Sequence, residues 1–218
     1  MDDERTLMLA GVAHDLRTPL TNIGLAIELL RIEKNSALID SVRRNIKDMD
    51  VLIAQFLDFA RAGTLETANG VDLNQLVREC AEGHAAWGRP LKLSLQTLPQ
   101  TQLRPQSIRR AIDNLVVNAL RHGAEDVLIE TRHLNGMVRV SVMDRGPGIP
   151  ASEVEMVKVP FARGHNSTQV RGTGLGLAIV EGIVRAHGGK FVLAARDGGG
   201  LEAQIHLPLP DDVARLID

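Results

Sequence analysis

A histidine, an acid and a hydroxyl residue stand together near the start of the chain, followed by a proline, in His14-Asp15-Leu16-Arg17-Thr18-Pro19-Leu20-Thr21. The apolar residues around this octet recur at intervals of three and four, which predicts an amphipathic helix; they are Leu9, Val12, Leu16, Leu20, Ile23, Ile27 and Leu30. At about 100° per residue, all of them lie within roughly 40° of Leu16, whereas His14 lies about 160° away. His14 is therefore expected on the exposed face, with Thr18 one turn later and almost above it.

Pro19 adds a kink to this helix. Proline removes a backbone donor and crowds the carbonyl four residues earlier, here that of Asp15. A lone surface histidine near a chance proline is common, but the complete octet favours a histidine that another molecule or domain reaches.

Composition excludes several classes of protein. The 218 residues are 44% hydrophobic, enough for one large domain or two small ones with a core. A net charge of −2 and an aromatic content of 2% argue against general nucleic-acid binding and against base stacking. Cys80 is the only cysteine, which excludes an internal disulfide and is typical of a reducing compartment. No apolar run approaches the roughly 18 residues that span a bilayer, and no signal peptide is evident, so a cytoplasmic location is expected.

Residues 1–62 are predicted to form a helical hairpin with a polar turn at 33–36. The second helix carries its own apolar stripe of Leu38, Val42, Ile46, Met49, Ile53, Phe56 and Ala60. Because two such helices alone bury little surface, we expect a homodimeric four-helix bundle. The alternative is a hairpin that packs on the C-terminal part of its own chain.

The pattern changes after residues 63–70, which contain two glycines and few apolar residues and are predicted to be a linker. Helices are predicted over 72–86, 105–122 and 175–187, and strands over 91–95, 126–133, 138–144, 190–195 and 202–207, with a hairpin turn at Asn135-Gly136. This order predicts a mixed sheet with helices on one face over residues 71–210, followed by a tail at 211–218. The fold class of the whole chain is therefore α+β.

Asp144 ends a predicted strand and begins the motif Asp144-Arg145-Gly146-Pro147-Gly148-Ile149. A carboxylate there can accept a hydrogen bond from an exocyclic amine while the glycines let the backbone approach a flat ring. The alternative is an Asx-type turn without a ligand.

A second glycine motif, Gly172-Thr173-Gly174-Leu175-Gly176-Leu177, precedes a predicted helix. Backbone amides at such a helix start can point at phosphate, which the helix dipole also favours. The motif does not follow a strand as a Rossmann fingerprint does, and Gly189-Lys190 lacks the Ser or Thr of a P-loop. A glycine hinge with a helix cap is the alternative. The long polar segment 150–171 between the two motifs is a candidate lid.

Asn114 and Asn118 are four residues apart on one predicted helix and share a face, with Arg121 one turn away. Two amide oxygens and a cation suit a magnesium–phosphate group, because magnesium keeps most of its waters. Two solvated asparagines on an amphipathic helix are the alternative.

All four motifs occur in one chain and in this order, and over nearly its whole length the chain resembles the cytoplasmic core of two-component sensor histidine kinases. Within that family, residues 11–21 and Phe161-Ala162-Arg163-Gly164 look most like those of an osmosensor. The resemblance implies a bifunctional enzyme, an ATP-dependent protein-histidine kinase that is also a phosphatase. Its cofactors would be ATP and Mg²⁺. Its partners would be a second copy of the chain and the receiver domain of a response regulator, and the full-length protein would be anchored in the inner membrane.

The resemblance also implies a role for each motif. His14 would accept the phosphoryl group, Asp15 would assist proton removal, and Thr18 would position water when the phosphorylated partner is dephosphorylated. Asn114 and Asn118 would face magnesium, and Asp144 would recognise adenine. The rest of the nucleotide pocket would comprise Arg121, His122, Gly146, Gly148, Ile149, Phe161, Arg163, Gly172, Thr173, Gly174, Leu175, Gly176 and Leu177. His122 stands where relatives often have a tyrosine beside the adenine.

Two other functions compete with this one. An ATPase of the chaperone or mismatch-repair type would share the nucleotide fold but lack a histidine motif on a helical hairpin. A degenerate dimeric scaffold would bind partners without ATP, which the intact His14, Asn118 and Asp144 argue against.

Overall fold

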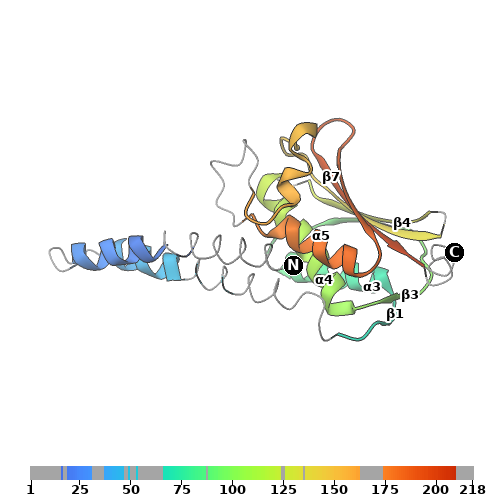
Figure 1. Cartoon of the computed structure of the whole chain (residues 1–218), viewed down its shortest axis with the longest axis horizontal. Helices are drawn as coiled ribbons and strands as arrows, with labels where there is room; N and C mark the ends of the chain where they lie inside the picture. Colours follow the sequence, from blue (N-terminus) through green and yellow to red (C-terminus); the bar gives the residue numbers. More distant parts are fainter. Residues whose placement is uncertain are drawn as a thin grey trace. The chain divides into compact units, whose positions relative to one another are not determined.

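The computed structural model describes residues 16, 19–30, 37–46, 49, 53, 66–86, 88–123, 126–134, 136–162 and 174–209. The chain divides into two compact units, Met1–Arg61 and Ala62–Asp218 (Figure 1). No helix within these described ranges is both long enough and apolar enough to cross a membrane.

The first unit has helical segments at residues 19–30 and 37–46, as the apolar spacing predicts. Several of its large apolar side chains are exposed. They are Leu20, Leu25, Ile27, Leu29, Ile39, Ile46 and Ile53. Apolar surface of this extent on paired helices is typical of a face that another protein surface covers.

The second unit is built on a mixed five-stranded sheet, in the order β2-β4-β5-β7-β6. Its strands are β2 (Lys92–Leu95), β4 (Leu128–Leu134), β5 (Met137–Met143), β6 (Lys190–Ala195) and β7 (Leu201–Pro208). Only β2 and β4 pair in parallel, and the other neighbours are antiparallel. A separate antiparallel pair joins β1 (Asn69–Val71) to β3 (Thr101–Leu103).

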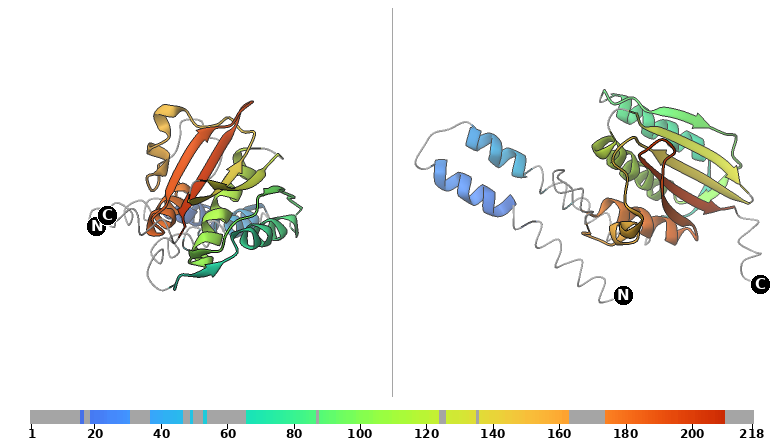
Figure 2. Two further views of the ribbon diagram at one scale, coloured as in Figure 1. Left: turned by 90° about the vertical axis from the view of Figure 1, so that its right-hand side faces the viewer. Right: turned by 90° about the horizontal axis from the view of Figure 1, so that it is seen from above.

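Three helices cover one face of this sheet: α3 (Leu73–Ala86), α4 (Pro105–His122) and α5 (Gly176–Ala186) (Figures 1 and 2). The strands alternate accordingly, and β7 buries Leu201, Ala203, Ile205 and Leu207 while the residues between them stay half-exposed. Short 3₁₀ turns follow β5 at Ala151–Glu153 and Met156–Lys158. The predicted α+β class, with a mixed sheet and helices on one face, is confirmed.

Helix α4 buries apolar side chains along one side. It begins at a proline, whose missing N–H is not needed in the first turn. Its residue before the first turn, Arg104, provides no side-chain cap. Glu66 supplies that cap instead, because its carboxylate accepts the N–H groups of Gln106 at 2.7 Å and Ser107 at 3.0 Å. Burial raises the pKa of Glu66, but the hydrogen bonds from these residues outweigh it and lower the pKa, which keeps the cap ionised.

The predicted helices and main strands agree with the structure to within a few residues at each end. The sequence pattern does not predict β1 and β3, because three residues are too few to show a periodic pattern. Asn69 and Gly70, the end of the segment predicted as a linker, lie in β1. Gly136 occupies the turn between β4 and β5 with a φ of 79°, while Asn135 lies outside the described residues.

His187, at the end of α5, joins this helix to the start of α4. Its Nδ1 lies 2.7 Å from the carbonyl oxygen of Ile183, and its Nε2 accepts the backbone N–H of Arg104 at 3.1 Å. An N–H can only donate, so Nε2 carries no proton in this arrangement. Burial lowers the pKa of His187, and Arg104 lowers it further.

Acid is therefore expected to destabilise this unit through His187. Because the folded pKa lies below the ordinary value of 6.5, the unfolded chain takes up the proton first. The stability is fully present above that value and is lost as the pH falls through the folded pKa. In thermal unfolding of residues 62–218, the midpoint should drop between about pH 7.5 and about pH 5.5, and His187→Gln should reduce the drop. The exposed His133 provides the control His133→Gln, and an equal reduction in both variants would contradict the assignment.

Candidate functional site

Asp144 directly follows β5 and is only 3% exposed. Its Oδ1 accepts the backbone N–H of Gly146 at 2.7 Å and that of Leu201 at 3.4 Å. Among the described residues, no hydrogen bond engages its Oδ2. The Asx-type turn and the recognition of an external amine are therefore compatible, because each uses a different oxygen of one carboxylate.

Two glycines let the end of α4 and the turn at Asp144 approach each other closely. Gly123, just beyond α4, has no room for a Cβ, which would overlap the Cβ of Asp144. A Cβ on Gly146 would overlap the carbonyl of His122. The end of α4, at His122 and Gly123, therefore packs directly against the Asp144 turn.

Helix α4 presents Asn114, Asn118 and His122 at intervals of four, so they lie along one face over about 12 Å. At one end, the amide nitrogen of Asn114 donates to the carbonyl of Arg110 at 2.9 Å, and a Cβ on Gly176 would lie 3.5 Å from the Asn114 Oδ1. At the other end, His122 adjoins Gly146. This face of α4 therefore runs from the start of α5 to the Asp144 turn.

The second glycine motif is described only from Gly174 onward. The backbone N–H of Phe161 donates to the carbonyl of Gly174 at 3.1 Å, and a Cβ on Gly174 would lie 2.8 Å from the carbonyl carbon of Phe161. The two chain segments that flank residues 163–173 are thus joined directly before α5 begins. Phe161 itself has a φ of 65°, a conformation that is strained for a residue with a side chain.

Helix α5 offers its amino end to the same region, since Leu175 provides no side-chain cap and no acidic residue occupies its first turn. The first amides of a helix have no partner within the helix, so such an end favours an anion. Leu175 is 0% exposed as a whole residue, so it belongs to the core rather than to the surface that a ligand would reach. Leu177, Gly148 and Ile149 are half-buried around the motifs, and Arg121 is exposed one turn from Asn118.

His122 is uncharged at neutral pH. Burial lowers its pKa, the neighbouring Arg121 lowers it further, and Asp144 opposes both. A neutral imidazole can lie against a flat ring without bringing a charge into the site.

Six predicted site residues lie outside the described residues: His14, Asp15, Thr18, Arg163, Gly172 and Thr173. So does the second part of the segment predicted as a lid, residues 163–171. Three residues that the sequence does not predict at the site also contact Asp144 in the structure: Gly123, Arg196 and Gly200. A glycine after a helix and a glycine-rich turn are visible in the sequence, but their contact with Asp144 is not.

Comparison with known proteins assigns both units. Residues 4–65 match the His Kinase A (phospho-acceptor) domain, and residues 104–211 match the histidine kinase-, DNA gyrase B-, and HSP90-like ATPase family. The histidine kinase domain of the Escherichia coli osmosensor EnvZ is 33% identical, with a TM-score of 0.53 over 68% of this chain and 92% of that domain. The chain belongs to the sensor histidine kinases.

Other members of the family support the same assignment. The sensor histidine kinase GtrS of Pseudomonas aeruginosa is 33% identical over 94% of this chain and 42% of its own length. A full-length ShkA structure in complex with AMPPNP has a TM-score of 0.65 at 26% identity, over 95% of this chain and 46% of that one. This histidine kinase core spans 37–60% of the length of the first curated relatives that it matches. The rival ATPase of the chaperone or mismatch-repair type is excluded, because its class has no phosphoacceptor domain.

Proposed function

We propose that this chain phosphorylates itself on His14 from ATP, passes the phosphoryl group to an aspartate of a response regulator, and dephosphorylates that regulator. The observation that carries the proposal is the presence, in one chain, of a phosphoacceptor match and of an ATPase-family match whose Asp144 keeps one carboxylate oxygen free among the described residues. ShkA, a relative over both units, was solved with AMPPNP, which supports ATP as the nucleotide.

The nucleotide would lie along the α4 face, with adenine at Asp144 and the phosphates toward Gly176. Magnesium fits this arrangement. The described residues contain no cluster of three or more His, Cys, Asp or Glu that could hold a metal ion. Asn114 commits its amide nitrogen to Arg110, which leaves its oxygen for a cation that prefers few protein oxygens beside phosphate. When bound, magnesium neutralises phosphate charge, and Asn114 and Asn118 would hold it.

In the proposed transfer, a neutral ring nitrogen of His14 attacks the γ-phosphorus, and the bond between that phosphorus and the bridging oxygen of ADP breaks. Asp15 accepts or orients the proton on the other ring nitrogen. The phosphoryl group then moves from nitrogen to a regulator carboxylate. In the proposed phosphatase reaction, Thr18 orients the water that hydrolyses the regulator's acyl phosphate.

Incubation with γ-labelled ATP and magnesium tests the kinase proposal. The expected product is labelled protein whose phosphoryl group is lost in acid and kept in base, because it is bonded to nitrogen. Phosphate release without labelled protein would indicate an ordinary ATPase, and neither product would indicate a scaffold.

Asp144→Asn is expected to weaken ATP binding about 10- to 100-fold. The variant loses one hydrogen bond to a charged group, and it places two hydrogen-bond donors against each other in a buried position. The N–H groups of Gly146 and Leu201 would keep the asparagine oxygen where Oδ1 now lies. The amide NH₂ would then face the adenine amine, donor against donor. Calorimetric titration with ATP measures this, and the exposed Asp197 provides the control Asp197→Asn. Unchanged ATP affinity in Asp144→Asn would show that Asp144 only forms the turn and does not bind adenine.

We also propose that the first unit forms a homodimeric four-helix bundle, which is typical of the family. Ile39, Ile46 and Ile53 are 46%, 48% and 42% exposed and recur every seven residues, as do Leu20 and Ile27 at 54% and 49%. A seven-residue apolar repeat forms one seam along a helix, and pairing with a second copy would bury it.

Ile46→Glu is expected to weaken the dimer at least about tenfold, because each copy loses a buried isoleucine and gains a desolvated charge. Sedimentation equilibrium measures the association. Arg44→Glu places the same new charge at an exposed position on the opposite side of this helix and should leave the dimer intact. A fully dimeric Ile46→Glu variant would place the interface elsewhere.

A further inference from the structure

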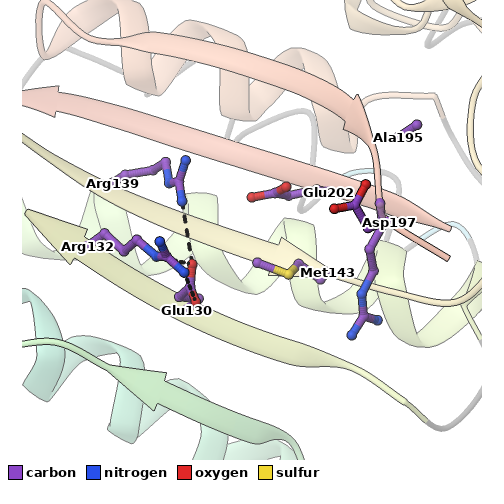
Figure 3. Close-up of a pocket in the computed structure, with 8 residues that line it drawn as sticks. Glu130, Arg132, Arg139, Met143, Ala195, Asp197 and Glu202 are labelled. Atoms are coloured by element: carbon purple, nitrogen blue, oxygen red, sulfur yellow. Dashed lines mark hydrogen bonds and ion pairs between the residues drawn. The ribbon is translucent and has the colours of Figure 1, made fainter. Parts of the chain in front are cut away.

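Arg196 holds the backbone of Asp144 from the side opposite α4. It directly follows β6, and its Nη1 donates to the Asp144 carbonyl at 3.1 Å. The Arg196 side chain is 12% exposed. Its neighbours Ala195 and Asp197 also line a hollow on the sheet face that the helices leave open, together with Met143 and Glu202 (Figure 3).

The turn after Arg196 also packs closely against the carbonyl of Asp144. Gly200 has a φ of 107°, and a Cβ there would overlap the carbonyl oxygen of Asp144. In the opposite direction, Arg145 Nη1 donates to the carbonyls of Asp197 at 2.7 Å and Gly199 at 3.1 Å. The end of β5 and the β6–β7 turn are therefore joined by two arginines that reach across in opposite directions.

Asp126 anchors both arginines. Its Oδ2 lies 3.7 Å from Arg145 Nε and 3.9 Å from Arg196 Nη1, and its own carbonyl accepts from Arg196 at 3.4 Å. A hydrogen bond of 2.6 Å from Lys92 lowers the pKa of Asp126, and both arginines lower it further. The carboxylate is thus ionised and fixes the direction from which Arg196 approaches Asp144.

With this contact, the backbone N–H, the backbone carbonyl and one side-chain oxygen of Asp144 all have hydrogen-bond partners. Its N–H donates to the carbonyl of Leu201 at 3.0 Å, its carbonyl accepts from Arg196, and its Oδ1 accepts two N–H groups. The remaining oxygen, Oδ2, then has a fixed direction.

We propose that Arg196 is a positioning residue for nucleobase selection, which keeps Asp144 Oδ2 aimed at the exocyclic amine of adenine. Adenine presents an amine where guanine presents a carbonyl oxygen, which a fixed carboxylate repels. A carboxylate that is free to tilt both accepts less well from adenine and repels guanine less. This inference rests on the proposed role of Asp144.

The test compares ATP and GTP binding, measured by calorimetry, in Arg196→Met, Arg196→Lys and Asp144→Asn. We expect Arg196→Met to weaken ATP binding about tenfold, to leave GTP binding within about twofold, and to raise KM for ATP with little change in kcat. Arg196→Lys should recover most of the selectivity, because one ammonium N–H can still reach the carbonyl. The exposed Arg78 supplies the control Arg78→Met.

The outcomes separate the two proposals. Equal losses of ATP and GTP affinity in Arg196→Met, or no rescue by lysine, would overturn the positioning role. If Asp144→Asn weakens ATP binding and Arg196→Met does not, the inference alone fails. If Asp144→Asn leaves ATP affinity unchanged, the proposed adenine contact fails and the inference fails with it. Thermal unfolding of each variant separates a local change from loss of the fold.

Discussion

His14→Ala is expected to abolish acid-labile, base-stable labelling from γ-labelled ATP. The imidazole is the proposed nucleophile, and alanine offers no atom that can form the phosphorus–nitrogen bond. Transfer to a response regulator should disappear with it, because the regulator would receive the group from the histidine. Nucleotide affinity should stay within about twofold of the unmodified chain, since Asp144 and the α4 face lie in the second unit.

A matched control uses His133, an exposed histidine of β4. His133→Ala should label as well as the unmodified chain. Undiminished labelling of His14→Ala would show that another residue accepts the phosphoryl group.

Thr18→Ala is expected to separate the two proposed activities, self-phosphorylation and dephosphorylation of the regulator. Thr18 lies four residues after His14, so a helix places it on the same face, where its hydroxyl can orient a water beside a bound phosphoryl-aspartate. Loss of that hydrogen bond should slow dephosphorylation of the regulator by on the order of 100-fold or more. Self-labelling should largely remain, because Thr18 has no proposed contact with ATP.

The measurement is the decay of a phosphorylated partner regulator, with magnesium and nucleotide present. Thr21→Ala removes a hydroxyl seven residues after His14, about 10 Å along the helix axis, and should have little effect. Decay with Thr18→Ala that is as fast as with the unmodified chain would leave Thr18 a structural residue beside Pro19.

The long elements of the fold were predictable because each repeats its pattern several times. Helix α4 buries Ile108, Ile112 and Leu115, and β7 alternates over its whole length. The three-residue strands β1 and β3 depend on pairing with each other rather than on a local pattern, so the sequence could not reveal them. The cap that Glu66 gives to α4 is likewise a contact between residues far apart in the chain.

At the candidate site, the sequence predicts Asp144 and the α4 face as binding residues but cannot show how the end of α4 meets the Asp144 turn. The sequence alone does not decide whether Asp144 forms a turn or binds a ligand. In the structure Oδ1 makes the turn and Oδ2 accepts no hydrogen bond from the described residues, so the two roles are compatible and the ligand role stays a proposal. Gly123, Arg196 and Gly200 were missed because each acts through tertiary contact. The roles of His14, Asp15 and Thr18 stay predictions, since these residues lie outside the described part of the chain.

The convergence of Gly123, Asp144 and Gly200 has a consequence for how the chain folds during synthesis. These residues come from the end of α4, the end of β5 and the turn before β7, so the corner that they build depends on contacts of high sequence separation. Asp144 forms two hydrogen bonds with Leu201, the first residue of β7: its N–H donates to the Leu201 carbonyl, and its Oδ1 accepts the Leu201 N–H. A ribosome must therefore release β7 before this corner can assemble, and a nascent chain that ends at α5 carries the α4 asparagines without the completed corner at Asp144.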